Sequence, residues 1–368
     1  MEVEFLLENI TPYTGSLLRV LSPHSQIPVL SSVLVEATEK GLSFSVTDLE
    51  FGTQHIIPAK IEKEGGVLVP GKQFLEVLSS LAQGKATLSQ EKDTIKLQTQ
   101  KNKFTFQCLP KDEFPKLYED TGKLVLKQEK KSFDETFSRL IFAVSQDEAR
   151  PHLTGVCVKV KNQQVEYVAT DGYRLSLVRT KGQEEVEAIG EGIILSPRLI
   201  TEGLSIKETG EIKLYINEEN NQAILQISGT TLVGRLIEGV YPDYERVLPK
   251  NLSIDVEVDS QEFSKSLKTV SVFARENANV VNLRFEQGTL YLGASSGTLG
   301  DAEVSLDTKQ AGDDVTISFN IKFLLDLLRV FEDKGVRIRL NSSTEPALFE
   351  PLTDKGFLHV IMPVRVQD

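Results

Sequence analysis

The segment Ala169-Thr170-Asp171 repeats Val46-Thr47-Asp48 after about 123 residues. Each copy closes a stretch in which apolar and polar residues alternate, the pattern typical of a half-buried strand. Each strand pattern lies between two segments whose apolar residues recur at helical spacing. A repeat of this kind indicates that one folding unit occurs more than once in the chain.

An amphipathic helix is expected at the start of each of three repeats, over Leu6–Leu21, Phe133–Val144 and Glu262–Ala274. Two of these helices have a candidate capping box at the N-terminus, in which an acidic side chain reaches back to the N-cap amide. The two boxes pair Ser132 with Glu135 and Asp259 with Glu262.

A second helix is expected in each repeat, beginning at Gly71, Pro197 and Ile321. Ser196 and Asn320 are suitable N-cap residues for the last two, and proline is favoured at the first helical position. The intervals between these starts are nearly equal, at about 126 and 124 residues. This regularity indicates three copies of the unit.

Hairpins are expected between the helices, because alternating segments flank short polar turns. The paired segments are 33–36 with 42–46, 156–160 with 165–168, and 283–286 with 290–292. Helices packed on antiparallel sheets define an α+β class. We therefore predict three repeated α+β domains, each with two helices, over residues 1–122, 123–250 and 251–368.

Composition describes an ordinary soluble protein of 368 residues with a net charge of −12. No apolar run is long enough to span a membrane, and the start of the chain, Met1–Phe5, is acidic where an export signal would be basic. These features favour a cytoplasmic location and no membrane partner. The acidic net charge does not exclude nucleic acid, because the distribution of charge decides what a surface attracts.

Basic residues recur on the expected helices of all three repeats, whereas acidic clusters fall largely elsewhere. This recurrence favours a shared basic surface, although solvated outer helix faces would give the same pattern. The residues that would form this basic surface are Arg19, Lys72, Arg139, Arg198, Lys265, Lys268 and Lys322.

No arrangement of residues in the sequence points to catalysis. Every Gly-Lys pair lacks the remainder of a phosphate-binding loop, and the four histidines have no metal-ligand spacing. We therefore expect no metal and no cofactor. A hydrolase with Asp48 or Asp171 in its site is the alternative, but their corresponding positions suit a shared turn better.

Ala169-Thr170-Asp171-Gly172-Tyr173-Arg174-Leu175 resembles the Ala-Thr-Asp-Gly-His-Arg-Leu segment of the bacterial DNA polymerase III beta clamp family. Further resemblances follow in the family's order along the whole chain. They are Ile27-Pro28-Val29-Leu30, Thr47-Asp48-Leu49-Glu50, Tyr241-Pro242-Asp243-Tyr244 and Met362-Pro363-Val364-Arg365-Val366.

The resemblance implies a DNA clamp fold and a head-to-tail homodimeric ring that encircles duplex DNA. It implies a processivity factor for DNA replication that catalyses no reaction. The partners it implies are the DNA polymerase III alpha subunit, the clamp loader and other proteins that carry a clamp-binding peptide.

The family's cleft for peptides similar to Gln-Leu-x-Leu-Phe lies between the second and third domains. Apolar walls suit the peptide's leucine and phenylalanine, and arginine suits its polar groups. Tyr173 replaces the family's usual histidine and Val364 a methionine, so peptide preference is expected to differ. Carried over by motif, the cleft comprises Leu153, Thr170, Gly172, Tyr173, Arg174, Leu175, Pro242, Val247, Val360, Met362, Pro363, Val364, Arg365 and Val366.

The resemblance also implies a dimer interface and a set of residues that face the DNA. The interface joins an apolar patch of the first domain, Val77, Phe104 and Phe106, to Val272 and Phe273 of another copy's third domain. The DNA-facing candidates are the residues of the basic surface together with His24 and Gln146, which are added by their position in the family.

Overall fold

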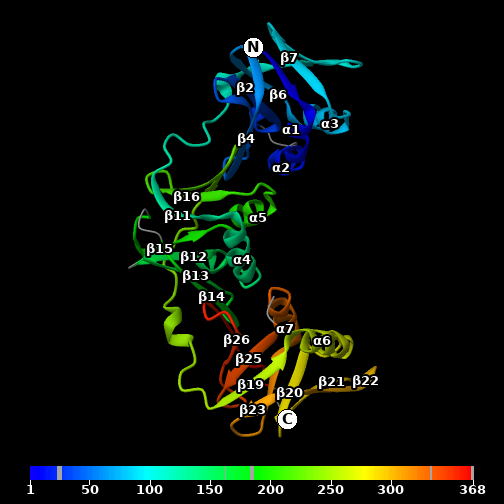
Figure 1. Ribbon diagram of the computed structural model, residues 1–368, viewed down its shortest axis with the longest axis vertical. Helices are drawn as coiled ribbons and strands as arrows, with labels where there is room; N and C mark the ends of the chain where they lie inside the picture. The colour runs from blue at the N-terminus through cyan, green and yellow to red at the C-terminus, as the bar shows by residue number, and fades with distance from the viewer. Residues whose placement is uncertain (23–26, 162, 183–185, 332–333, 366–368) are drawn as a thin grey trace. The chain divides into compact units, whose positions relative to one another are not determined.

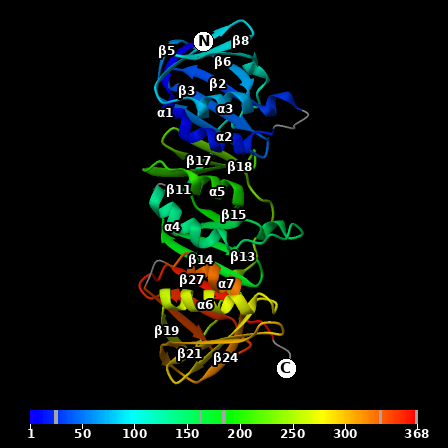
Figure 2. The same cartoon turned by 90° about the vertical axis from the view of Figure 1, so that its right-hand side faces the viewer.

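The computed structural model describes residues 1–22, 27–161, 163–182, 186–331 and 334–365 (Figures 1 and 2). The chain divides into two compact units, and each is described by itself. The first unit consists of Met1–Phe133, Glu185–Glu187 and Arg198–Leu236, and the second of Asp134–Glu184, Ala188–Pro197 and Ile237–Asp368.

The first unit contains two antiparallel sheets, with strand orders β10-β6-β2-β3-β4-β18-β17-β16-β11 and β5-β1-β7-β8-β9. Hairpins such as β2–β3 and β7–β8 form where alternating segments flank short polar turns. The strands are β1 (Glu2–Leu6), β2 (Ser32–Thr38), β3 (Gly41–Thr47), β4 (Phe51–Ile57), β5 (Ala59–Lys63), β6 (Gly65–Pro70), β7 (Lys85–Glu91), β8 (Thr94–Thr99), β9 (Lys103–Gln107), β10 (Leu109–Pro110), β11 (Lys123–Glu129), β16 (Glu211–Asn217), β17 (Gln222–Ile227) and β18 (Thr230–Arg235).

The helices of the first unit are α1 (Leu7–Ile10), α2 (Thr14–Val20), α3 (Gly71–Ser80) and α5 (Pro197–Ser205), the last from Arg198 onward. α2 and α3 lie side by side (Figure 1). Buried aromatic rings connect the layers: Phe44 on β3 lies 6.5 Å from Phe5 on β1 and 6.4 Å from Phe74 on α3, between ring centroids. This core fixes α3 against both sheets.

The second unit also has two antiparallel sheets, with orders β15-β12-β13-β14-β27-β26-β25-β19-β23 and β22-β21-β20-β24. A ring contact of 5.8 Å between Phe319 on β24 and Phe349 on β26 connects them. The strands are β12 (Val156–Lys161), β13 (Gln164–Thr170), β14 (Arg174–Lys181), β15 (Ile189–Leu195), β19 (Ile254–Asp259), β20 (Val280–Glu286), β21 (Thr289–Ser296), β22 (Gly300–Asp307), β23 (Lys309–Ala311), β24 (Val315–Asn320), β25 (Gly335–Leu340), β26 (Ala347–Pro351) and β27 (Phe357–Ile361).

The second unit's helices are α6 (Ser260–Ala274), α7 (Ile321–Leu328) and α4 (Lys130–Ile141) from Asp134 onward. α6 and α7 lie side by side (Figure 1). Both start at side-chain caps: Asp259 Oδ1 accepts the amide hydrogens of Gln261 and Glu262, and Asn320 does the same for Lys322. These bonds satisfy amides that a helix leaves without a partner in its first turn.

Most of the sequence-based predictions of elements are confirmed. The second helices begin at the predicted residues, and the three predicted hairpins are present. The capping box at Ser132 is wrong, because α4 already begins at Lys130 and Ser132 lies within it. The same helix ends at Ile141, before the predicted end at Val144. The helix expected over Leu6–Leu21 is divided by a 3-10 turn at Thr11–Tyr13, where Pro12 lacks the amide hydrogen that a continuous α-helix requires.

Each nine-stranded sheet contains a seam, at which strands from two different predicted domains pair. β4 pairs with β18 in the first unit, and β14 pairs with β27 in the second. The backbone ladder therefore continues from one predicted domain into the next.

A buried histidine lies at each seam, opposite a hydroxyl residue. His55 Nδ1 is 2.9 Å from Thr230 Oγ1, and His359 Nδ1 is 2.7 Å from Ser176 Oγ. Burial lowers the pKa of His55 to about 4 and that of His359 to about 3. Both imidazoles are therefore neutral near pH 7.

Candidate functional site

A tight turn leads from β13 to β14 and contributes one side of the candidate site. Asp171 Oδ1 accepts the amide hydrogens of Tyr173 at 2.9 Å and Arg174 at 3.0 Å. Thr170 Oγ1 donates to the Arg174 carbonyl at 2.6 Å and accepts the Gly172 amide at 3.1 Å. Gly172 has a φ of +92°, which glycine adopts without steric cost. Asp171 thus has a structural role in the turn.

A pocket of about 170 Å³ lies beside this turn in the second unit. Ten of its lining residues are those that the sequence assigns to the cleft, and Asp243 and Tyr244 add to them. The ten are Leu153, Thr170, Gly172, Tyr173, Arg174, Leu175, Pro242, Val247, Val360 and Met362. Segments distant in sequence, from the β13–β14 turn to the end of β27, therefore meet at one site.

Three of the described residues that the sequence assigns to the cleft do not line this pocket. Pro363, Val364 and Arg365 follow its last lining residue, Met362, and Val364 donates its amide hydrogen to Ser318 on β24 at 2.8 Å. Val366 lies outside the described residues.

The pocket has a buried apolar floor and an exposed apolar rim. Leu175 and Val360 face each other across the β14–β27 seam and belong to a buried cluster with Leu153. At the rim, Tyr173 is 64% exposed and Met362 is 41% exposed. Large apolar side chains that remain exposed around a concave site indicate a binding surface for another apolar group.

Tyr244 holds the linker 241–247 against the sheet. Its hydroxyl donates to Glu166 Oε2 at 2.5 Å, and Arg179 Nε donates to Glu166 Oε1 at 2.7 Å. Burial and the bond to Glu166 raise the pKa of Tyr244. Burial alone would raise the pKa of Glu166, but the bonds from Tyr244 and Arg179 outweigh it and lower that pKa. The linker wall of the pocket is thus preorganised.

Arg174 connects the pocket wall to three other parts of the second unit. Its Nε donates to Asp171 Oδ2 at 3.0 Å, and Nη1 donates to Asp326 Oδ2 on α7 at 2.9 Å. Nη2 donates to the Phe142 carbonyl at 2.6 Å, and the guanidinium lies 4.5 Å from the centroid of the Phe323 ring. The side chain is only 10% exposed. It is therefore a structural anchor of the pocket wall.

The basic residues of the helices differ in whether acidic partners neutralise them. Arg19 pairs with Glu202 at 2.6 Å, Arg139 with Asp354 at 2.6 Å, and Arg198 with Asp48. The lysines and Gln146 are exposed, and the described residues place no carboxylate within 4.0 Å of these lysines. The four exposed lysines are Lys72, Lys265, Lys268 and Lys322. His24 lies outside the described residues.

Candidate interface residues lie near edge strands in both units. β9 is an edge of the five-stranded sheet, and its Phe106 meets the Phe74 ring edge-on at 5.4 Å. Phe104 on β9 and Val77 on α3 are half-buried. On α6 of the second unit, Val272 is 55% exposed and Phe273 is half-buried. β22 is an edge of the four-stranded sheet.

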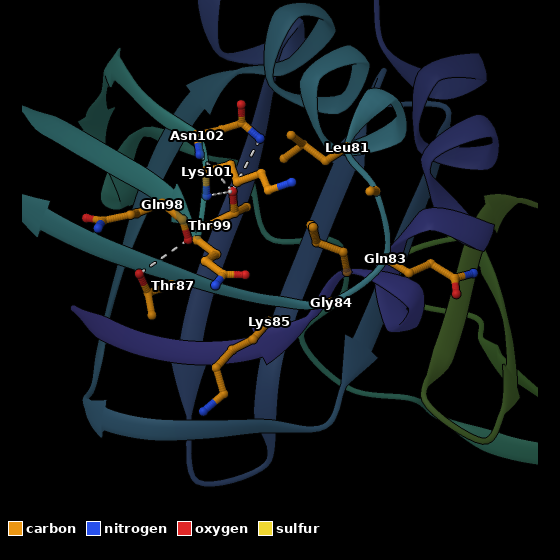
Figure 3. A pocket seen from close by; sticks show the side chains of 12 residues that line it. Leu81, Gln83, Gly84, Lys85, Thr87, Gln98, Thr99, Lys101 and Asn102 are labelled. Atoms are coloured by element: carbon orange, nitrogen blue, oxygen red, sulfur yellow. Dashed lines mark hydrogen bonds between the residues drawn. The ribbon is translucent and has the colours of Figure 1, made fainter.

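A second pocket, of about 640 Å³, lies between the end of α3 and the β8–β9 turn (Figure 3). Its polar lining is largely satisfied within the turn: Thr99 Oγ1 accepts from the amides of Lys101 and Asn102 (Figure 3). Lys85, at its margin, pairs with Glu4 at 2.7 Å. The residues that line this pocket include no acid–base pair, and nothing in them indicates a particular ligand.

Within the part of the chain that the structure describes, no three His, Cys, Asp or Glu residues gather as a metal site. The same residues include no helix long and apolar enough to cross a membrane.

The repeated α+β units, the continuous seams and an apolar pocket beside the second seam are features of a three-domain clamp fold. Family models of the DNA polymerase III beta subunit match almost the whole chain: the N-terminal domain at residues 4–118, the central domain at 127–243 and the C-terminal domain at 245–365. The chain therefore belongs to the DNA polymerase III beta subunit family, the non-catalytic sliding clamps that give polymerases processivity.

Relatives and solved structures agree with this assignment. The beta sliding clamp of Chlamydia trachomatis is 28% identical over 350 residues, which cover 95% of this chain and 83% of the relative. That of Haemophilus influenzae is 26% identical over the full length of both chains. The structure of the DNA polymerase III beta subunit of Thermotoga maritima has a TM-score of 0.87 at 26% identity and covers 100% of both chains. The Bacillus subtilis clamp, with a TM-score of 0.92 at 23% identity, supports the fold.

Proposed function

We propose that two copies of this chain form a head-to-tail ring around duplex DNA and tether the replicative polymerase to it. The apolar pocket at the β14–β27 seam carries this proposal, because it offers a preorganised site for a partner's peptide. A closed ring stays on DNA by topological linkage, so it can slide without reading bases. We further propose domain limits near Gly122 and Lys250 and a cytoplasmic location.

The unpaired edge strands support head-to-tail association. A heterologous contact closes into a ring when its rotation closes. The turn and strand at one edge carry exposed Lys101 and Lys103, and the β22 edge carries exposed Asp301 and Asp307. Opposite charges on two edges favour their pairing and oppose self-pairing of either edge.

We place Val77, Phe104 and Phe106 of one copy against Val272 and Phe273 of the other. Burying these side chains removes apolar surface from water, which favours association. The double variant Phe106→Ala/Phe273→Ala should run as a monomer by light scattering, whereas Leu352→Ala, an exposed control, should remain dimeric. An unchanged mass for the double variant would refute this interface.

The pocket is proposed to take the leucine and phenylalanine side chains of clamp-binding peptides, with the exposed rim at Tyr173 and Met362 folding over them. Partners would be the DNA polymerase III alpha subunit, the clamp loader and other proteins with such a peptide. Fluorescence anisotropy with a labelled Gln-Leu-x-Leu-Phe peptide tests the site. Met362→Lys should weaken binding at least about tenfold, because it puts a charge at an apolar contact. Leu352→Lys is the matched control.

The exposed lysines on α3, α6 and α7 are proposed to face the phosphates of the encircled duplex. Attraction to phosphates without base contacts would let the ring slide. A primer-extension assay on a singly primed circular template, with loader and polymerase, tests the whole function. The wild-type chain should lengthen the products made in one binding event, whereas Met362→Lys should not. Equal product length with and without the wild-type chain would overturn the proposal.

A further inference from the structure

Asp326 on α7 shares its carboxylate between two arginines that differ widely in exposure. Its Oδ2 accepts from Arg174 Nη1 at 2.9 Å, and its Oδ1 accepts from Arg329 Nη1 at 3.2 Å. The side chain of Arg174 is 10% exposed, that of Asp326 is 25% exposed and that of Arg329 is 75% exposed. The carboxylate therefore connects the anchor of the pocket wall to a cation at the surface.

The exposed cations of α7 lie on the same helix face as Asp326. Lys322 precedes Asp326 by four residues and Arg329 follows it by three, the spacings that make side chains neighbours on a helix. Arg329 is the C-cap residue and keeps helical angles, with φ −68° and ψ −26°, so the face extends to it. Asp326 is the one acid in the sequence of this helix. An anion attracted to these cations thus arrives beside the carboxylate that holds Arg174.

Arg174 transmits its position to the pocket through the β13–β14 turn. Its Nε donates to Asp171 Oδ2 at 3.0 Å, and its guanidinium lies 4.5 Å from the centroid of the Phe323 ring. Its chain neighbours are Tyr173 at the exposed rim and Leu175 on the buried floor. A firmer hold on the guanidinium therefore orders both the rim and the floor before a peptide arrives, which favours binding.

The two arginines compete for one negative charge. When Arg329 turns to a phosphate instead, the whole charge of Asp326 attracts Arg174. Solvent and salt screen this attraction less than that of the exposed Arg329, because Arg174 is largely buried. An exposed ion pair changes an equilibrium constant by a factor of about two to five, so the gain at the cleft should have that size.

We propose that Asp326 is a positioning residue that couples the peptide cleft to anion binding on α7. A duplex phosphate that engages Arg329 releases Asp326 to Arg174 and strengthens peptide binding, and a bound peptide strengthens duplex binding by the same factor. The inference rests on the proposed function, which assigns a peptide to the cleft and a duplex to α7. A ring on DNA would then bind its partners more tightly than a free ring.

The test measures the affinity of the labelled Gln-Leu-x-Leu-Phe peptide by anisotropy, with and without a saturating short linear duplex at low salt. A linear duplex can enter a ring from its end, so no loader is needed. The duplex should raise the peptide affinity of the wild-type chain about two- to fivefold. Arg329→Met should show this gain without the duplex and no further gain with it, because Asp326 is then left to Arg174 alone.

Arg275→Met is the matched control, because Arg275 is an exposed arginine at the C-cap of α6 and its loss changes the net charge equally. It should leave the peptide affinity and its response to the duplex as in the wild-type chain. Asp326→Asn should weaken peptide binding at least about twofold and remove the response to the duplex. Adding Arg329→Met to Asp326→Asn should change the peptide affinity no further, which independent structural roles of the two side chains would not give.

Thermal unfolding reports whether each variant folds, and the exposed Arg329→Met tests the coupling even if Asp326→Asn does not fold. If Arg329→Met binds the peptide no more tightly than Arg275→Met, the coupling is refuted and the cleft stands. A duplex that lowers the peptide affinity of the wild-type chain would also refute it, since the two ligands would then compete. If the wild-type chain binds no peptide, the proposed cleft fails and the coupling fails with it.

Discussion

Replacing Arg174 with alanine should destabilise the second unit rather than simply remove a contact with a ligand. The guanidinium joins three elements: Asp171 in the β13–β14 turn, Asp326 on α7 and the carbonyl of Phe142 after α4. All three bonds lie between 2.6 and 3.0 Å. Without Arg174, Asp171 would keep only the amides of its turn, Asp326 would keep only Arg329, and the Phe142 carbonyl would lose this donor.

The magnitude follows from the burial of the charged groups. The side chains of Arg174, Asp171 and Asp326 are 10%, 16% and 25% exposed, so solvent screens their attraction only in part. Removing one member of a buried ion pair typically costs about 3–5 kcal/mol. We expect the lower end, about 3 kcal/mol, because the carboxylates keep some contact with water.

Urea unfolding followed by hydrogen exchange in the second unit measures this loss. Exchange separates the two units, which a single global transition would not. Arg174→Lys should recover little of the stability, because one ammonium cannot reproduce the planar fork. A double-mutant cycle of Arg174→Ala and Asp326→Ala should give a coupling free energy of about 1–3 kcal/mol between the two side chains. A loss below about 1 kcal/mol for Arg174→Ala would contradict the anchoring role.

Three further predictions concern the seams, a cap and the linker. The pKa of His55 is about 4 in the folded chain against about 6.5 when unfolded, so the free energy of unfolding should fall by about 2 kcal/mol between pH 6.5 and 5. This fall should be absent in His55→Asn. Equal slopes of the unfolding free energy against pH in the wild-type chain and the variant would refute the prediction. Asp259→Ala should destabilise α6 by about 1 kcal/mol in urea unfolding, and Asp259→Asn by less, since it keeps the acceptor. Tyr244→Phe should lower the free energy of unfolding by about 1.5–3 kcal/mol, because it removes the hydroxyl bond to Glu166, and it should weaken peptide binding in the anisotropy assay. Unchanged affinity would show that the linker wall does not need this bond.

Local rules predicted the elements of the fold well, where a signal lies within a few residues. The proline after Ser196 and the asparagine at position 320 marked helix starts at Pro197 and Ile321. The rule failed at Ser132, where tertiary packing extends α4 backwards to Lys130 and overrides a good N-cap residue. A capping residue marks a possible start, but it does not prevent an earlier one.

The candidate site was predictable only through the resemblance and the repeat. The cleft residues come from four separated segments, and no spacing rule brings Leu153 to Met362. The repeat did identify the shared turn role of Asp48 and Asp171, since residues at equivalent positions adopt equivalent hydrogen bonds. The sequence could not show that Arg174 is bound on three sides, because its partner Asp326 lies far along the chain on α7.

The central claim is that the chain holds DNA by encircling it. The direct measurement is retention on a nicked circular plasmid after loading, followed by release when the plasmid is cut once. We predict stable retention on the circle and rapid loss on linearisation, because a ring slides off a free end. Retention unchanged by the cut would instead show ordinary electrostatic binding and contradict the ring.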